Sequence, residues 1–180
     1  PAQFDGFDFQ ELISPQKDVD GFHKDDIFSI YKKTSGEFLL PCTPIGIIKL
    51  LDHYIISAKC KNVVIIGRSL IVGKPLSMML SNLDATVTLC HSKTNNLSTL
   101  TKQADIIISA VGRPKFLTSD YFNKSGNQII IDVGISSVKN NKIAGDVDFE
   151  NVKDRVNSIT PVPGGVGPMT ILSLAKNLVK

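Results

Sequence analysis

The sequence predicts an α/β fold, built on a doubly wound and mostly parallel sheet. From residue 62 onward, short runs rich in β-branched residues alternate with segments of helical period. These runs are apolar at nearly every position, which indicates strands that are covered by helices on both faces of the sheet. In such a sheet, ligands bind at the carboxyl ends of the strands.

The elements follow in a regular order. The expected strands are residues 62–67, 86–92, 105–112, 128–136 and 158–163. Between them, segments of helical period cover residues 73–83, 96–104, 117–126 and 148–156. Each pair of strands is thereby separated by a segment long enough for a crossover, which parallel pairing requires.

Two further helices flank this region. In residues 41–57, Pro44 suits the first turn of a helix, and we expect Thr43 to be its N-cap. The apolar residues of this helix lie mainly along one face and are Ile47, Ile48, Leu50, Leu51 and Ile55. Residues 169–180 have a similar pattern and predict a helix at the end of the chain.

Composition narrows the class of protein. The chain has 180 residues, 42% of them hydrophobic, and its apolar runs are far shorter than the ~20 residues that span a bilayer. A net charge of +3 with scattered basic residues gives no support for a nucleic-acid surface. The three cysteines have no CxxC spacing, so we expect no disulfide framework, no metal site and a reducing, cytoplasmic location. We expect Cys42 and Cys90 to be buried and His53 to be structural.

Residues 62–75 have the pattern of a phosphate-binding turn. A buried strand ends at Gly67, and a helix is expected to begin near Gly73, where free N–H groups and the helix dipole attract phosphate. The spacing is not GxGxxG, so the general dinucleotide fingerprint is incomplete. The alternative is that both glycines serve only a tight turn between strand and helix.

The end of the second strand favours NADP over NAD. An NAD site usually places a carboxylate there for the ribose, but this strand is followed by His91, Ser92 and Lys93. Together with Arg68, these residues offer charge and hydroxyl donors to a 2′-phosphate. The alternative is a solvated basic turn.

Four motifs give the chain a resemblance to a known family. GRSLIVGKP, KDVDGF, PCTPIG and PVPGGVGPMT resemble the bifunctional methylenetetrahydrofolate dehydrogenase and methenyltetrahydrofolate cyclohydrolase family, from Pro1 almost to Lys180. The resemblance implies a Rossmann-like NADP-binding domain with a remnant of a second α/β domain. On this basis we expect residues 1–42 to be that remnant, residues 43–160 the NADP-binding domain, and residues 161–180 a substrate loop and returning helix.

The same resemblance assigns the site. It implies that NADP contacts Gly67, Arg68, Ser69 and Ser92, with Ile135 beside the nicotinamide. It also implies that Asp20 is the catalytic and substrate-binding carboxylate that holds the pterin of the folate. The substrate loop beside the nicotinamide would comprise Pro163, Gly164, Gly165, Val166 and Gly167. From the residues alone, Asp18 and Asp20 are equally typical of a solvated turn, and PVPGGVG of a rigid loop.

The resemblance further implies an activity in one-carbon folate metabolism, which supplies purine biosynthesis. The family oxidises 5,10-methylenetetrahydrofolate with NADP and hydrolyses the product to 10-formyltetrahydrofolate, as a homodimer that binds tetrahydrofolate derivatives. The family's N-terminal Tyr, Lys and QLPLP motif are not found here. Pro1 resembles the last proline of that motif, so we expect a fragment that binds cofactor with little or no catalysis.

One segment and two rival functions remain open. Residues 24–40 depart from the family pattern, so we expect an altered path there. One rival is an NAD-linked dehydrogenase without cyclohydrolase activity. The other is a noncatalytic dinucleotide-binding module.

Overall fold

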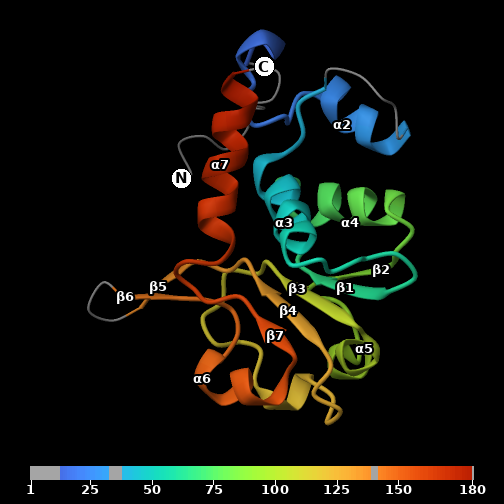
Figure 1. Ribbon diagram of the computed structural model, residues 1–180, viewed down its shortest axis with the longest axis vertical. Helices are drawn as coiled ribbons and strands as arrows, with labels where there is room; N and C mark the ends of the chain where they lie inside the picture. Colours follow the sequence, from blue (N-terminus) through green and yellow to red (C-terminus); the bar gives the residue numbers. More distant parts are fainter. Residues whose placement is uncertain (1–12, 33–37, 139–141, 180) are drawn as a thin grey trace.

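A five-stranded parallel sheet forms the centre of the molecule and confirms the predicted α/β class. The computed structural model describes residues 13–32, 38–138 and 142–179. The strands are β1 (Asn62–Ile66), β2 (Thr86–Cys90), β3 (Ile106–Ser109), β4 (Ile129–Asp132) and β7 (Ser158–Ile159). Their order in the sheet is β2-β1-β3-β4-β7, which is the doubly wound arrangement (Figure 1).

The register of the strands aligns their carboxyl ends along one edge. Ile66 of β1 pairs with Cys90 of β2 and with Ser109 of β3. Ser109 in turn pairs with Asp132 of β4. Segments that follow these strands are therefore neighbours in space, although they lie far apart in the sequence.

Helices cover both faces of the sheet (Figure 1). On one face, α3 (Cys42–His53) and α4 (Gly73–Asn82) pack against Ile65 and Ile108. On the other face, α5 (Leu97–Gln103) and α6 (Phe149–Val152) join a second core that contains Val64 and Ile107. Two short 3₁₀ turns, η3 (Ser119–Tyr121) and η5 (Lys153–Arg155), belong to the same side. The mostly apolar sequences of the central strands β1, β3 and β4 follow directly from this double coverage.

Two more helices extend the structure beyond the sheet. The last helix, α7 (Val166–Leu178), lies along α3 so closely that a Cβ on Gly46 would be 3.0 Å from the backbone of Met169. A further helix, α2 (Lys24–Lys32), follows the short turn η2 (Pro15–Lys17) and stands against α4, where Asn82 Nδ2 donates a hydrogen bond to Ile30 O at 2.6 Å (Figure 1). In the part of the chain that is described, none of the helices combines the length and the apolar character that a membrane span requires.

The segment after β4 differs from the prediction of one long strand over residues 128–136. The parallel strand ends at Asp132, and β5 (Ser136–Val138) and β6 (Lys142–Ala144) then form an antiparallel hairpin beside the sheet (Figure 1). The cause is a turn at residues 133–135, because Gly134 N donates to the Asp132 carboxylate at 3.0 Å. The following strand is also shorter than predicted, with only Ser158 and Ile159 in the sheet.

The prediction of a helix over residues 117–126 is wrong. Only Ser119–Tyr121 form a 3₁₀ turn, and the backbone is extended at Thr118 and Phe122. Phe122 is buried in the second core, and Gln128 Oε1 accepts a hydrogen bond from Asn123 N at 2.8 Å. These tertiary contacts hold the segment as a loop and override its helical period.

Three boundaries also need correction. Pro41 is the N-cap of α3, so Thr43 lies inside the helix and does not cap it. Because α3 ends at His53, Ile55 lies outside the helix and is 93% exposed, with a φ of 58°. The last helix begins at Val166, three residues before the predicted start at residue 169. Cys42 and Cys90 are buried, as predicted.

The predictions near the start of the chain are only partly within the described residues. Pro1 lies outside them, as do residues 33–37 of the segment expected to take an altered path. Residues 24–32 form α2, and residues 38–40 lead into α3.

Candidate functional site

The turn between β1 and α4 depends on its two glycines for steric reasons. Gly67 has a φ of 120°, and a Cβ there would be 2.4 Å from Ala110 O. A Cβ on Gly73 would be only 1.9 Å from Gly67 O. Both glycines are therefore required by packing within the protein, and their spacing alone does not decide whether the turn binds phosphate.

Hydrogen bonding within the turn gives a more specific indication. The hydroxyl of Ser69 accepts hydrogen bonds from the N–H groups of Val72 at 3.1 Å and Gly73 at 3.4 Å, so Ser69 caps the start of α4. Gly67 N donates to Cys90 O at 2.9 Å and is not free. The N–H groups of residues 68–71 have no hydrogen-bond partner among the described residues. Four consecutive free donors at the edge of a parallel sheet are suited to an anion.

A basic and a hydroxyl side chain are exposed in this turn and in the neighbouring one. Arg68 is the second residue after β1, and Ser92 is the second residue after β2. That turn is held by Thr94, whose hydroxyl accepts from His91 N at 2.9 Å and whose N–H donates to His91 O at 2.9 Å. Neither turn carries a carboxylate, so the local charge favours a phosphate.

A cavity of ≈ 590 Å³ opens beside this edge of the sheet. Residues 132–135 line it, and so does the predicted substrate loop, residues 163–167. Val72 reaches it from the turn before α4, and Thr43 reaches it from α3. Ile135 is 66% exposed within it. The size falls in the range of small-molecule sites.

The structure thus brings some predicted site residues together and leaves others apart. Ile135 and all five residues of the substrate loop line the cavity, whereas Gly67, Arg68, Ser69 and Ser92 do not. These four belong to the adjoining pair of turns. This division fits an extended ligand with an anionic part over the turns and a flat part in the cavity.

Asp20 lies on a separate segment that is docked against α3 and α7. Asp18 is buried and accepts hydrogen bonds from the N–H groups of Gly21, at 3.1 Å, and of His23, which fixes the turn that presents Asp20. Burial raises the pKa of the Cys42 thiol to about 12, and the neighbouring Asp20 carboxylate adds to this rise. Asp20 is therefore next to Cys42, one residue from Thr43 at the rim of the cavity.

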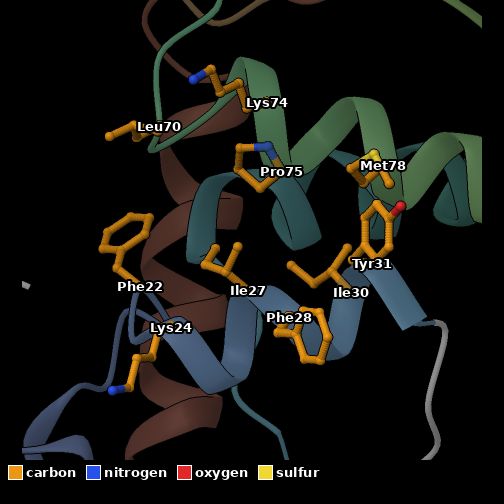
Figure 2. Close-up of a pocket in the computed structure, with 10 residues that line it drawn as sticks. All are labelled: Phe22, Lys24, Ile27, Phe28, Ile30, Tyr31, Leu70, Lys74, Pro75 and Met78. Carbon is orange, nitrogen blue, oxygen red and sulfur yellow. The ribbon is translucent and has the colours of Figure 1, made fainter.

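A second cavity, of ≈ 500 Å³, lies between α2 and α4 (Figure 2). Its walls are mainly apolar and include Phe22 and Phe28 from the α2 side and Met78 from the α4 side, with Lys24 and Lys74 among them. None of the predicted site residues lines it. Leu70, from the turn after β1, also lines it, but its walls are mainly apolar and Arg68, Ser69 and Ser92 are not among them, so we do not assign it to the cofactor.

Two buried carboxylates near the first cavity were not foreseen. Asp132 is the last residue of β4 and is 3% exposed, and Asp146 follows β6 and is fully buried. Burial raises the pKa of Asp132 to about 6. The signal in the sequence was an aspartate at the end of the apolar run QIII, with a glycine two residues later. Among the described residues, no group of three or more potential ligands is placed to hold a metal ion.

The doubly wound sheet and the anion-binding turn at its carboxyl edge define a dinucleotide-binding α/β domain. Residues 41–180 match the sequence-family model for the NAD(P)-binding domain of the tetrahydrofolate dehydrogenase/cyclohydrolase family. The chain belongs to this family, as its motifs predicted, and these residues form its NAD(P)-binding domain.

Individual relatives agree with this assignment. The chain is 50% identical over 180 residues to the bifunctional protein FolD of Rickettsia massiliae, covering all of this chain and 62% of that protein. It is similar to the FolD methylenetetrahydrofolate dehydrogenase/cyclohydrolase structure from Campylobacter jejuni, with 50% identity and a TM-score of 0.89 over 94% of this chain and 59% of that one. The Trypanosoma brucei FolD structure, complexed with NADP and an inhibitor, has 32% identity and a TM-score of 0.86 over the same shares, 94% and 59%. The chain thus spans about three fifths of the length of the relatives it matches.

Proposed function

We propose that this chain provides the NADP-binding part of an enzyme that oxidises 5,10-methylenetetrahydrofolate to 5,10-methenyltetrahydrofolate. The same enzyme would then hydrolyse this product to 10-formyltetrahydrofolate. Membership of the family supports both steps, since relatives that share about half of their residues with this chain are bifunctional proteins.

The observation that carries the proposal is the shared cavity. The loop expected to hold the nicotinamide, which includes Ile135, and the expected folate loop, residues 163–167, both line one space of ≈ 590 Å³. Hydride transfer requires donor and acceptor carbons to be held in contact with their faces aligned. A single cavity lined by both loops supports the proposal, because it would bring the two reactants together.

The residues of the chain would mainly bind and align the reactants. NADP, when bound, supplies the hydride acceptor. Arg68 and Ser92 would receive the 2′-phosphate, while the free N–H groups of residues 68–71 would face the bridging phosphates. Asp20 would hold the pterin from the α3 side, and Ile135 would exclude water from one face of the nicotinamide.

Arg68→Ala tests the cofactor assignment. Loss of one charged hydrogen bond to a phosphate should weaken NADP binding by ~1.5 to 3 kcal/mol, and NAD binding should change much less. Calorimetric titration of both dinucleotides measures this difference. Arg155→Ala is the matched control, because Arg155 is also exposed but precedes β7, at the opposite edge of the sheet. Equal losses for NADP and NAD would mean that Arg68 supports the turn and does not read the 2′-phosphate.

The catalytic assignment needs a separate test. We expect the 180-residue chain to bind NADP but to show little or no turnover, because the family's N-terminal Tyr, Lys and Gln motif is not found in it. A spectrophotometric assay with methylenetetrahydrofolate should detect turnover only in a protein that includes that motif. Substantial turnover by the chain alone would contradict this expectation, and no turnover by the longer protein would refute the proposed activity.

We further propose a cytoplasmic homodimer that acts in the one-carbon supply of purine biosynthesis. β2 lies at an edge of the sheet, where one row of its backbone groups is unpaired within the sheet, and such an edge is suited to pairing with a second copy. Light scattering after size-exclusion chromatography would measure the mass in solution. A monomeric mass at micromolar concentration would refute the dimer.

A further inference from the structure

The end of β4 is joined to the segment after β6 by the buried carboxylate of Asp132. Its Oδ1 accepts hydrogen bonds from Gly134 N at 3.0 Å and Asp146 N at 2.9 Å. Its Oδ2 accepts one from Val147 N at 2.9 Å. One side chain therefore fixes both the turn that leads to Ile135 and the return of the hairpin.

Asp146 makes the corresponding connection to β3. Its Oδ2 accepts from Ser109 Oγ at 2.9 Å and from Val111 N at 2.8 Å. Its Oδ1 accepts from Arg113 N at 2.8 Å. The carboxylate thereby holds the loop that follows β3. That loop begins at Ala110, the residue against which Gly67 of the phosphate-binding turn is packed.

The two carboxylates also interlock through glycines. A Cβ on Gly134 would be 2.1 Å from Asp146 Oδ1, and a Cβ on Gly145 would be 2.1 Å from Asp132 Oδ2. Each carboxylate thus occupies the space that a side chain would take on the other's segment. The segments after β3, β4 and β6 are held as one unit, and residues 132–135 of that unit line the cavity.

Burying two ionisable side chains next to each other lowers the stability of the fold, so packing alone does not account for Asp132 and Asp146. Burial, with a smaller contribution from the nearby Asp146 charge, raises the pKa of Asp132 to about 6, although its backbone donors act in the opposite direction. A buried charge lowers stability unless it is fully hydrogen-bonded. The pair provides acceptors for six donors, five of which are backbone N–H groups in the segments after β3, β4 and β6. Such support keeps a binding surface in one geometry.

We propose that Asp132 and Asp146 are positioning residues that fix the nicotinamide side of the cofactor site. They act through the loops of residues 110–113 and 133–135, because their carboxylate oxygens accept hydrogen bonds from these segments. The inference rests on the proposed binding of NADP. It predicts that the pair matters for the nicotinamide half of the cofactor and not for the adenosine half, which is expected over the turns after β1 and β2.

The test compares two ligands on the 180-residue chain by isothermal titration. NADP contains both halves, and adenosine 2′,5′-bisphosphate contains only the adenosine half with its 2′-phosphate. In Asp146→Asn and Asp132→Asn we expect NADP affinity to fall about tenfold and adenosine 2′,5′-bisphosphate affinity to stay within about twofold. Asp84→Asn is the matched control, since Asp84 is an exposed carboxylate that pairs with Lys59 before β2, outside the interlocked unit, and it should change neither affinity.

The possible outcomes separate this inference from the proposed function. If the unaltered chain binds neither ligand, the proposed function fails. If it binds both ligands, equal losses in the variants, or unchanged NADP affinity, would overturn the inference. Should the asparagine variants not fold, Ser109→Ala removes only one of the three hydrogen bonds to Asp146. It should then weaken NADP about threefold with no effect on the smaller ligand, and an equal effect on both would overturn the inference.

Discussion

Substitution of Gly73 by alanine tests the packing on which the phosphate-binding turn depends. The added Cβ would lie 1.9 Å from Gly67 O, whereas non-bonded carbon and oxygen atoms require about 3.2 Å. The oxygen belongs to the backbone, and Gly67 N is itself bound to Cys90 O, so neither side of the contact yields easily. α4 would have to move by about 1 Å, and it buries Leu76 and Leu80 in the core. We expect a loss of about 3 kcal/mol in the free energy of unfolding.

For a chain of this length that loss corresponds to a fall of roughly 6 to 12 °C in Tm. Thermal and urea denaturation followed by circular dichroism measure it. Gly167→Ala is the matched control, because Gly167 also lies in the first turn of a helix but a Cβ there meets nothing within 4 Å. It should leave stability unchanged or raise it by up to ~1 kcal/mol. If Gly73→Ala were as stable as the unaltered chain to within ~0.5 kcal/mol, the steric account of the turn would be refuted.

Three further predictions concern stability. Ile55 is 93% exposed and has a φ of 58°, a left-handed conformation that asparagine adopts more readily than a β-branched residue. Ile55→Asn should therefore raise the free energy of unfolding by about 1 kcal/mol, and a lower urea midpoint would contradict this. Gln128 is 1% exposed, and its side-chain amide binds Thr101 O, Ala104 O and Asn123 N. Gln128→Met should therefore lower the free energy of unfolding in urea by about 3 kcal/mol. A decrease below ~1 kcal/mol would show that the loop does not depend on Gln128. Burial raises the pKa of Asp132 from 3.8 to about 6, so between these pH values the folded chain binds more protons than the unfolded chain. The free energy of unfolding should therefore fall by up to about 3 kcal/mol as pH rises through this range. Urea titrations at several pH values should show this slope in the unaltered chain and not in Asp132→Asn, and identical slopes would contradict the assignment.

The sheet was predictable because its strands are buried on both faces. Runs such as residues 63–66 and 106–108 are apolar throughout, and few structures other than a covered parallel strand bury every residue of so short a run. The start of α4 at Gly73 was also predictable, since a glycine after a buried strand is typical of a tight turn into a helix. Residues 117–126 were not, because their helical period competes with the burial of Phe122 and the bond from Asn123 N to Gln128.

The candidate site was predictable only in parts. The motifs located the turn after β1 and the glycine-rich loop, and the structure placed residues 163–167 and Ile135 around one cavity. The cap that Ser69 forms on α4 and the free donors of residues 68–71 could not be read from spacing, because they depend on the path of the backbone. Asp146 was missed for the same reason, since its partners Ser109 and Arg113 lie more than thirty residues earlier.

The sequence by itself determined the class of fold and the family, and it predicted the turns that would hold the cofactor, because local hydrophobic pattern and short motifs encode these properties directly. Only the tertiary structure decided how the strand ends are joined. The carboxylates of Asp132 and Asp146 acquire their role when register brings the ends of β3 and β4 side by side and places a glycine opposite each of them. A buried charge is stable only with donors from several segments, and no single stretch of sequence contains them all.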